Sequence, residues 1–223
     1  ASSAYNEALS LAGDMSVSLD DYNKKKHVLN FKKWVSIINF RDNGLYFKTP
    51  IYLKKKYFEY YLDEDTSLKF DADDLFYYST HSIMKRGGHY FVSDYGMQVN
   101  ILNRYGIKNF AVAGKDYRFV NGDSTDSRYI NIDIINHYNG VSREISKGLY
   151  QYTAKIHING DFIIGRYDNE ADAGIAYNKA VDFLWSKGVT IDYHKNYIDG
   201  LNSDEYKKRY ENITISKKLR DYN

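Results

Sequence analysis

The spacing of apolar residues changes abruptly in the last third of the 223-residue chain, and this change constrains the fold more than any other feature. Apolar side chains alternate from Tyr152 to Ile158, which is the period-two pattern of a strand with one buried face. Asn159-Gly160 then provides a tight-turn sequence, and residues 162–165 supply a returning strand. The pattern therefore predicts an antiparallel hairpin.

A helix is predicted directly after this hairpin. Asn169 is a good helix-capping residue, and Asp172 follows at the third helical position. Small and apolar residues then recur at helical spacing until Gly188, which is expected to end the helix. The stripe consists of Ala173, Ala176, Tyr177, Ala180 and Leu184. Because alanines let a helix lie close to a sheet, residues 138–200 are expected to form a three-stranded antiparallel sheet packed on one helix.

The same residues carry a set of framework motifs, Y-x-G-V, A-x-I, G-x-Y/F and A-x-A-Y-N-x-A, in this order. The matching positions are Tyr138, Gly140, Val141, Ala154, Ile156, Gly165, Tyr167, Asp168, Ala173, Ala176, Tyr177, Asn178 and Ala180. This framework resembles the DNA-binding domain of plant ethylene-response factors (the APETALA type), which bacterial and phage HNH proteins also carry. The resemblance implies a sheet whose solvent face enters the major groove of duplex DNA.

The resemblance also implies which residues contact DNA. On the sheet they would be Asn139, Ser142, Gln151, Thr153, Lys155 and His157, together with Glu144, Asp161 and Ile163. Arg143 and Arg166 are expected beside this face, and the upstream cations Arg118, Arg128, Lys108 and Lys115 are expected to assist. Residues 138–200 contain 7 Lys and Arg against 8 Asp and Glu, a net charge of −1. Since each phosphate contact requires a cation, weak to moderate affinity for DNA is expected.

A second resemblance lies upstream, in the stretch KDYRFVNGDSTDSRYINIDIIN at 115–136. It resembles the HNH nuclease core, D-H-I-N-G-D followed by D-N-R and N-L. The matching positions are Asn121, Gly122, Asp123, Asp126, Arg128, Asn131 and Ile132. The hairpin sequence VSDYGMQV, within residues 89–101, is similar to one that often precedes the nuclease module in phage homing-endonuclease-like proteins.

The catalytic residues of an HNH nuclease are missing from this stretch. Arg118 and Phe119 stand where the family has the D-H pair, whose histidine takes a proton from water. A phenyl ring neither accepts a proton nor binds a metal ion, and arginine stays protonated in proteins. We therefore expect no catalytic residue, no metal site and no enzymatic activity. Asn121 and Gly122 are predicted to serve a turn, and Asp126 and Arg128 to share a structural hydrogen bond.

The remaining segments predict an α+β protein with a mixed N-terminal part. A helix is expected over residues 18–41, stopped at Asp42-Asn43-Gly44, and short strands are expected over 45–62. A second helix is expected over 71–86, capped by Asp71 and ended by Gly87-Gly88.

Four segments are expected along the chain. They are an accessory or partner-binding domain at 1–84, a degenerate HNH-like region at 85–137, an APETALA-type domain at 138–200 and a helical tail at 201–223. The tail is expected to pack Tyr206, Tyr210 and Ile213 on the domain that precedes it.

Composition narrows the classes of function. The 31 Lys and Arg against 29 Asp and Glu give a net charge of +2, which excludes both an acidic DNA mimic and a strongly basic coat protein. The chain has no cysteine, and its six histidines show no pair at metal-ligand spacing. No stretch reaches the roughly 18 apolar residues that span a bilayer. We expect a protein of the bacterial cytoplasm with no cofactor and no membrane partner.

Two functions remain open at this point. The first is a non-catalytic phage or mobile-element protein that binds duplex DNA through the sheet face. The alternative is a phage counter-defence inhibitor of the anti-CRISPR type, which would bind a host protein such as a CRISPR effector. In that case the tyrosine-rich segment 46–78, with acidic runs at 63–65 and 71–74, would face a basic nucleic-acid channel.

Overall fold

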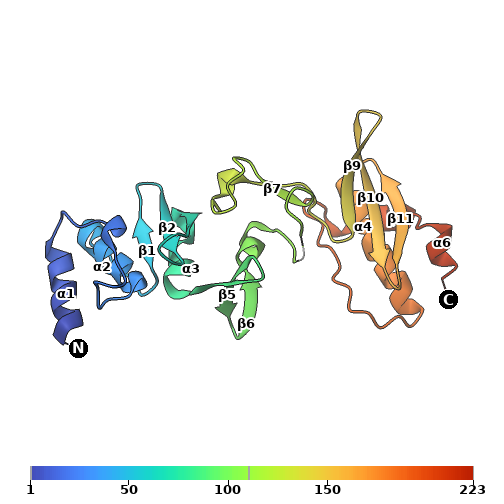
Figure 1. Ribbon diagram of the computed structural model, residues 1–223. Coiled ribbons are helices and arrows are strands. Elements are labelled where there is room, and N and C mark those ends of the chain that lie inside the picture. Colours follow the sequence, from blue (N-terminus) through green and yellow to red (C-terminus); the bar gives the residue numbers. More distant parts are fainter. Residues whose placement is uncertain (1, 110, 223) are drawn as a thin grey trace. The chain divides into compact units, whose positions relative to one another are not determined.

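The computed structural model describes residues 2–109 and 111–222 and shows helices together with antiparallel sheets, which confirms the α+β class (Figure 1). The described residues form two compact units. The first unit comprises the chain up to Tyr105 together with residues 119–133, and the second comprises 106–118 together with the chain from Ile134 onward. Residues 119–133 thus pack with the N-terminal part, whereas the division into four separate domains stays a prediction.

Three α-helices, two short 3-10 turns and a sheet form the beginning of the first unit as the structure describes it. Its elements are α1 (Ser2–Gly13), η1 (Leu19–Asp21), α2 (Phe31–Asn43), β1 (Ile51–Leu53), β2 (Tyr57–Tyr61), β3 (Ser67–Asp71), η2 (Ala72–Asp74) and α3 (Leu75–Thr80). The strands form an antiparallel sheet in the order β1-β2-β3. The strands expected over 45–62 are therefore confirmed as β1 and β2, while β3 was not expected. Leu11 of α1 packs on Trp34, Val35 and Ile38 of α2.

A second sheet completes the first unit. It consists of β4 (Ile83–Arg86), β5 (His89–Asp94) and β6 (Met97–Asn100), followed by η3 (Ile101–Tyr105), and η4 (Tyr129–Asn131) belongs to the later segment. The turn between β5 and β6 has φ of 46° at Tyr95 and 79° at Gly96. The hairpin predicted at 89–101 is therefore confirmed.

The helix expected over residues 18–41 is wrong in its first half. Ser18 and Asp21 do form a capping box, but it opens only the single turn η1. The long helix begins at Phe31, where the Asn30 side chain accepts a hydrogen bond from the Lys33 amide. The amides of Val28 and Leu29 donate to the Glu7 carboxylate at 2.8 and 2.9 Å. In a continuous helix these two amides would instead donate to backbone carbonyls one turn earlier, so the contact with Glu7 replaces helical hydrogen bonds.

The helix expected over residues 71–86 is also too long. It ends at Thr80, and β4 begins at Ile83, whose side chain is buried and pairs with Val92 of β5. Gly87-Gly88 forms the turn of the β4–β5 hairpin and does not end a helix. The Asp71 side chain makes no capping bond, because its carboxylate accepts the Tyr129 amide at 2.6 Å.

The second unit contains the sheet and helix that the alternating pattern predicts. Its main elements are β9 (Val141–Ser146), β10 (Leu149–His157), β11 (Asp161–Tyr167), α4 (Glu170–Ser186), α5 (Ser203–Asn212) and α6 (Lys217–Arg220). The sheet is antiparallel in the order β11-β10-β9, and α4 packs against all three strands. Asn169 caps α4 by accepting the Asp172 amide at 2.8 Å. The sheet-and-helix prediction for residues 138–200 is confirmed.

Two further strands lie where the chain passes between the units. They are β7 (Tyr117–Phe119) and β8 (Ile132–Ile134), which form a two-stranded sheet. No helix among the described residues is both long and apolar enough to cross a bilayer.

The C-terminal tail packs on α4, as predicted. The Tyr210 hydroxyl donates to the Asp182 carboxylate at 2.9 Å, and the Asn178 amide donates to the Tyr206 hydroxyl at 3.0 Å. The Lys179 ammonium group donates to the carbonyls of Tyr210 and Ile213, near the C-terminal end of α5, where a cation is favourable. The tail is therefore part of the second unit's core.

Gly140 is the position in the second unit at which a side chain would be most costly. Its φ is +70°, and an added Cβ would lie 2.2 Å from the Tyr177 ring and 2.4 Å from the Lys155 carbonyl. Gly148, with φ of +80°, has nothing within 4 Å of the same atom. The two glycines therefore share a backbone requirement but differ in steric surroundings.

We predict that Gly140→Ala destabilises the protein by about 3 kcal/mol, which combines the cost of a positive φ with that of overpacking. Gly148→Ala is the matched control, and its cost is limited to about 1 kcal/mol by the backbone conformation alone. Urea unfolding followed by circular dichroism measures both. Equal urea midpoints for the two variants would contradict the close packing around Gly140.

Candidate nucleic-acid interface

The sheet of the second unit has one face that α4 does not cover. Ala154 and Ile156 of β10 and Ile164 of β11 point toward α4 and are buried. Residues directly opposite each other in a ladder share a face, so the pairing register assigns the other side chains. This outer face consists of Ser142, Glu144, Gln151, Thr153, Lys155, His157, Asp161, Ile163 and Arg166.

An irregularity in β11 brings Arg166 onto the outer face. Ala154 pairs with Gly165, but the next residue, Lys155, pairs with Ile163, so β11 carries one extra residue at this point. Arg166 consequently lies opposite Thr153 and is exposed. If side chains alternated regularly between the two faces from Asp161 onward, Arg166 would instead lie on the face covered by α4. The expectation that Arg166 lies only beside the face is therefore corrected.

Thr153 and Asn139 differ from their expected exposure. Thr153 lies on the outer face but is only 1% exposed, because it is a short side chain in the middle strand with Ser142 and Arg166 on either side. Asn139 precedes β9 and is tied by hydrogen bonds to Asn196, with its amide N–H donating to the Asn196 side chain at 2.7 Å. Neither residue presents its side chain on an open sheet surface.

Arg143 lies on the opposite side of β9 from the outer face. It pairs with Tyr152, and its guanidinium group lies 4.7 Å from the centre of the Tyr150 ring. The sequence predicted Arg143 as a DNA-contacting residue beside the contact face, whereas the register places it on the other face of the strand, the same face as Tyr152.

A cleft of about 420 Å³ opens where β9 begins, beside the end of β10 that pairs with β11 but has no partner on its β9 side. Four basic side chains line it, and we call this the lysine cleft: Lys108, Lys115, Lys155 and His157. The first two come from the segment before β7 and are therefore far from the sheet in sequence. The upstream lysines that were expected to assist the sheet thus lie beside Lys155.

The acidic groups of the lysine cleft are already hydrogen-bonded. Burial disfavours ionisation of Asp116, but donors from Asn136 and Val112 outweigh this and lower its pKa. A hydrogen bond from His157 at 2.9 Å lowers the pKa of Asp161. Both carboxylates therefore remain charged near neutral pH and reduce the positive charge of the cleft without removing it.

Lys108 is the most enclosed of these cations. Desolvation lowers the pKa of its ammonium group, which donates to the Tyr138 carbonyl at 2.6 Å. Lys115 is exposed and Lys155 is half-buried, so these two are better placed to meet an anion from solution.

The two upstream arginines fall in different units. Arg118 belongs to β7 in the second unit and is exposed. Arg128 belongs to the first unit, where its guanidinium group donates to both oxygens of the Asp126 carboxylate, at 2.7 and 2.6 Å. The predicted structural hydrogen bond between Asp126 and Arg128 is confirmed.

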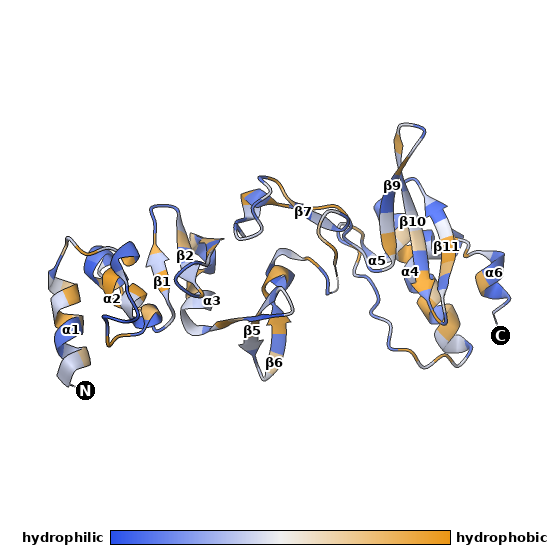
Figure 2. Ribbon diagram, in the orientation of Figure 1, coloured by the Kyte–Doolittle hydropathy of each residue, from blue (hydrophilic) through white to orange (hydrophobic). Residues whose placement is uncertain are grey.

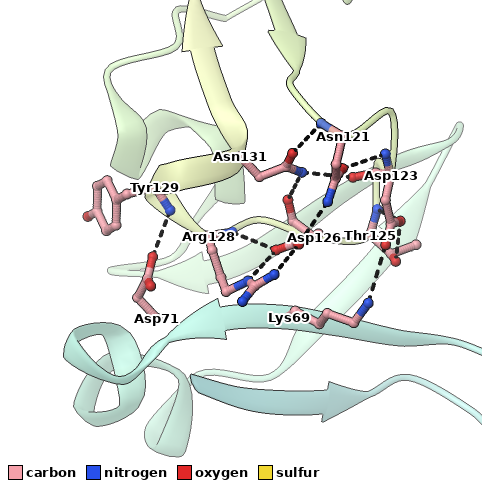
Figure 3. A network of polar contacts seen from close by, with 9 residues as sticks. All are labelled: Lys69, Asp71, Asn121, Asp123, Thr125, Asp126, Arg128, Tyr129 and Asn131. Atoms are coloured by element: carbon pink, nitrogen blue, oxygen red, sulfur yellow. Dashed lines mark hydrogen bonds and ion pairs between the residues drawn. The ribbon is translucent and has the colours of Figure 1, made fainter. Parts of the chain in front are cut away.

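The HNH-like residues form the polar network of Figure 3. The buried Asp126 carboxylate also accepts the Asn121 side-chain amide at 3.2 Å, while Gly122 takes the turn with a φ of 77°. Asn131 is buried, and its side chain donates to the Asp126 carbonyl at 2.7 Å and accepts the Asn121 amide at 2.8 Å. These positions therefore hold one loop together, as predicted for Asn121 and Gly122.

The network is also linked to the sheet of the first unit. Lys69 of β3 contacts the Asp123 carboxylate at 3.3 Å, and the backbone of Lys69 exchanges hydrogen bonds with Thr125 and Ser127. Among the described residues, no group of three or more histidine, aspartate or glutamate side chains is arranged to hold a metal ion.

Comparison of the chain with protein-family models, with curated proteins and with solved structures finds no match. The resemblances to the HNH and APETALA-type families therefore rest on the motifs themselves. The assignment of the interface rests on the geometry of the second unit.

Two parts of this candidate interface were not predicted from the sequence. The cleft itself depends on Tyr177 and Tyr193, which line it from α4 and from the segment after it, and the Tyr193 hydroxyl donates to the His157 carbonyl at 2.7 Å. The extra residue in β11 was hidden because residues 162–165 read as a continuous apolar strand. In retrospect, the Y-x-G-V motif is the one local signal for the cleft, since Gly140 forms part of its wall.

We predict that Asp126→Asn destabilises the first unit by about 2 kcal/mol at pH 7, because an amide in place of the buried carboxylate cannot accept both hydrogen bonds from the half-buried Arg128 guanidinium group. The hydrogen bond from Arg128 lowers the pKa of Asp126 in the folded protein. The stabilisation is therefore complete above the unfolded pKa of about 4 and is lost as the pH falls through the lower folded value.

Urea unfolding monitored by Trp34 fluorescence, in a Trp185→Phe background, measures this effect in the first unit. The difference between the Asp126 protein and Asp126→Asn should shrink below about pH 4. Asp73→Asn changes an exposed carboxylate and serves as the control. A pH-independent difference would contradict the ionised pair.

Proposed function

We propose that this protein binds duplex DNA through the outer face of β9–β11 and the adjoining lysine cleft, and that it does not cleave DNA. The observation that carries the proposal is the junction of an uncovered polar sheet face with a cleft lined by Lys108, Lys115 and Lys155. These lysines come from two distant parts of the sequence.

The outer face has the chemistry that base edges require. Gln151 offers both a donor and an acceptor, and Arg166 and Lys155 offer charged donors. Strands presented in this way are a known means of contacting the major groove, where glutamine pairs with adenine and arginine or lysine with guanine. The cleft lysines would then contact phosphates and position the sheet.

The number of available cations limits the expected affinity. Lys115 and Arg166 are exposed, Lys155 is half-buried, and Lys108 is engaged with a carbonyl. Glu144 lies on the same face and opposes binding. About two to four phosphate contacts follow, and the logarithm of affinity should fall with the logarithm of salt concentration with a slope of about −2 to −4.

We predict that Lys155→Ala and Arg166→Ala each weaken binding of pooled random duplexes and each reduce the salt slope by about one. Gel shifts across a salt series measure both quantities. Lys187→Ala is the matched control, because it removes an exposed lysine at the end of α4. Undetectable binding at low salt would contradict the proposal.

Absence of cleavage is a separate expectation. Phe119 occupies the position at which an HNH nuclease has its catalytic histidine, and the matched polar residues are engaged in the network around Asp126. We predict no nicking of supercoiled plasmid with Mg²⁺ or Mn²⁺. Nicking that disappears in Asn121→Ala or Asn131→Ala would show that this loop is a catalytic site.

A second candidate function is favoured by a cleft of about 240 Å³ in the first unit. Three carboxylates and three aromatic rings line it together with Leu19: Asp20, Glu64, Asp65, Tyr22, Phe31 and Tyr61. Such a lining suits an arginine or lysine side chain of a partner protein, through charge and cation–π contact. This supports the alternative of a counter-defence inhibitor that binds a basic nucleic-acid-handling protein, such as a CRISPR effector.

Only part of the acidic surface expected for that alternative is accessible. Asp63, Glu64 and Asp65 are exposed, whereas Asp71 accepts the Tyr129 amide and the buried Asp74 pairs with Arg104. The salt series also separates the two functions, since a chain without affinity for DNA at low salt would favour the inhibitor.

A further inference from the structure

We infer that the tip of the β9–β10 hairpin, residues 145–150, is an apolar wedge that contacts the bases of the bound duplex. This inference rests on the proposed DNA binding and extends it to a second contact of a different kind. The outer face and the lysine cleft would supply ionic and polar contacts, whereas the tip would supply apolar ones.

The hairpin extends beyond the third strand. The last residue pair between β10 and β11 is Tyr152 with Tyr167, while β9 and β10 stay paired as far as Ser146 with Leu149. The tip is therefore a two-stranded ribbon that projects from the sheet (Figure 1). A two-stranded ribbon is narrow enough to enter a DNA groove.

The tip exposes three large apolar side chains that the fold does not use. Ile145 is 74% exposed, Leu149 is 75% exposed and Tyr150 is 56% exposed, and none belongs to the core of the second unit. Figure 2 colours the ribbon by hydropathy and shows an apolar stretch in orange near the projecting end of this hairpin. Single exposed apolar residues are common, but three on one projecting turn form a concentrated apolar surface.

These side chains lie on both faces of the ribbon. Leu149 shares the outer face with Gln151, so it continues the proposed DNA-binding surface along β10. Ile145 and Tyr150 are cross-strand partners on the other face. A flat partner protein would cover one face only, whereas insertion between base edges or groove walls contacts both, and this favours DNA as the occupant.

Charge at the tip is also suited to a groove. Lys147 lies in the turn with a φ of 52°, followed by Gly148 at 80°, which gives a tight two-residue turn with an exposed ammonium group at its end. Arg143 lies over the Tyr150 ring at the base of the tip. Within residues 143–150, Arg143 and Lys147 are the cations and Glu144 is the one acidic residue. Phosphates border the floor of a DNA groove, so cations on either side of an inserted apolar tip would lie near them.

The two kinds of contact differ in their salt dependence, and this provides the test. Ionic contacts release counterions and lose strength with salt, but apolar contacts do not. We predict that Ile145→Thr/Leu149→Thr weakens duplex binding about tenfold at every salt concentration without changing the salt slope. Threonine is β-branched and preserves strand propensity, so the exposed tip keeps its fold.

The experiment uses the full chain, fluorescence anisotropy across a salt series, and duplexes carrying 2-aminopurine to report unstacking. The unsubstituted protein should raise 2-aminopurine fluorescence, and Ile145→Thr/Leu149→Thr should not. Tyr95→Ser removes a 98% exposed aromatic residue at the tip of another hairpin and should change neither quantity. Leu149→Ser alone, with thermal melting of each variant, guards against a folding defect.

Each outcome bears on a stated claim. DNA binding that stays unaffected by the tip variants overturns the wedge but leaves the sheet-and-cleft proposal standing. Loss of affinity with a reduced salt slope also overturns the wedge, because the lost contact is then ionic. Absence of binding by the unsubstituted protein at low salt overturns both proposals together.

Discussion

The close approach of Gly140 to the Tyr177 ring and to the Lys155 carbonyl organises the second unit. The Lys155 amide donates to the Gly140 carbonyl at 2.7 Å, so the backbone of Gly140 is bonded directly to β10. β9 begins at the next residue, Val141. Any side chain at position 140 would force the two apart. Because the register of β9 starts here, Ser142 lies opposite Thr153 and Glu144 opposite Gln151. The end of β10 beyond Ala154 is left unpaired by β9, and the lysine cleft occupies that place.

The two faces of the sheet in this unit differ in polarity. α4 brings a stripe of small residues against the inner face, and Ala173, Ala176 and Ala180 are all fully buried there. The tail then closes the far side of α4 through Tyr206 and Tyr210. Because the apolar residues of one face are buried under α4, the outer face carries mainly polar and charged side chains, with Ile163 and Leu149 as apolar exceptions.

In the first unit the polar network around Asp126 has the corresponding structural role. A buried carboxylate is costly unless it is paired and fully hydrogen-bonded. Here Arg128 and Asn121 supply the donors, and Asn131 fixes the loop backbone. Residues that resemble a nuclease core thus serve the packing of a loop against β3. Such a network requires no catalytic group, so the HNH-like pattern of these residues is compatible with a purely structural role.

By itself the sequence determined the elements whose signals are local. Alternation from Tyr152 to Ile158, the Asn159-Gly160 turn and the Asn169 cap each act within a few residues, so the sheet and helix of the second unit were predictable. The same holds for the hairpin with Gly96 at its turn, and for the bond between Asp126 and its near neighbour Arg128.

Only the tertiary structure decided the features that depend on distant partners. The Glu7 carboxylate accepts hydrogen bonds from the amides of Val28 and Leu29, so that α2 begins only at Phe31. No local sequence pattern reveals this contact. The extra residue in β11 exposes Arg166, and the fold brings Lys108 and Lys115 to Lys155. The physical reason is that hydrogen-bond partners, buried contacts and neighbouring charges come from residues that are distant in sequence. Helix and strand propensity and the period of apolar residues, by contrast, depend only on residues that are close in sequence.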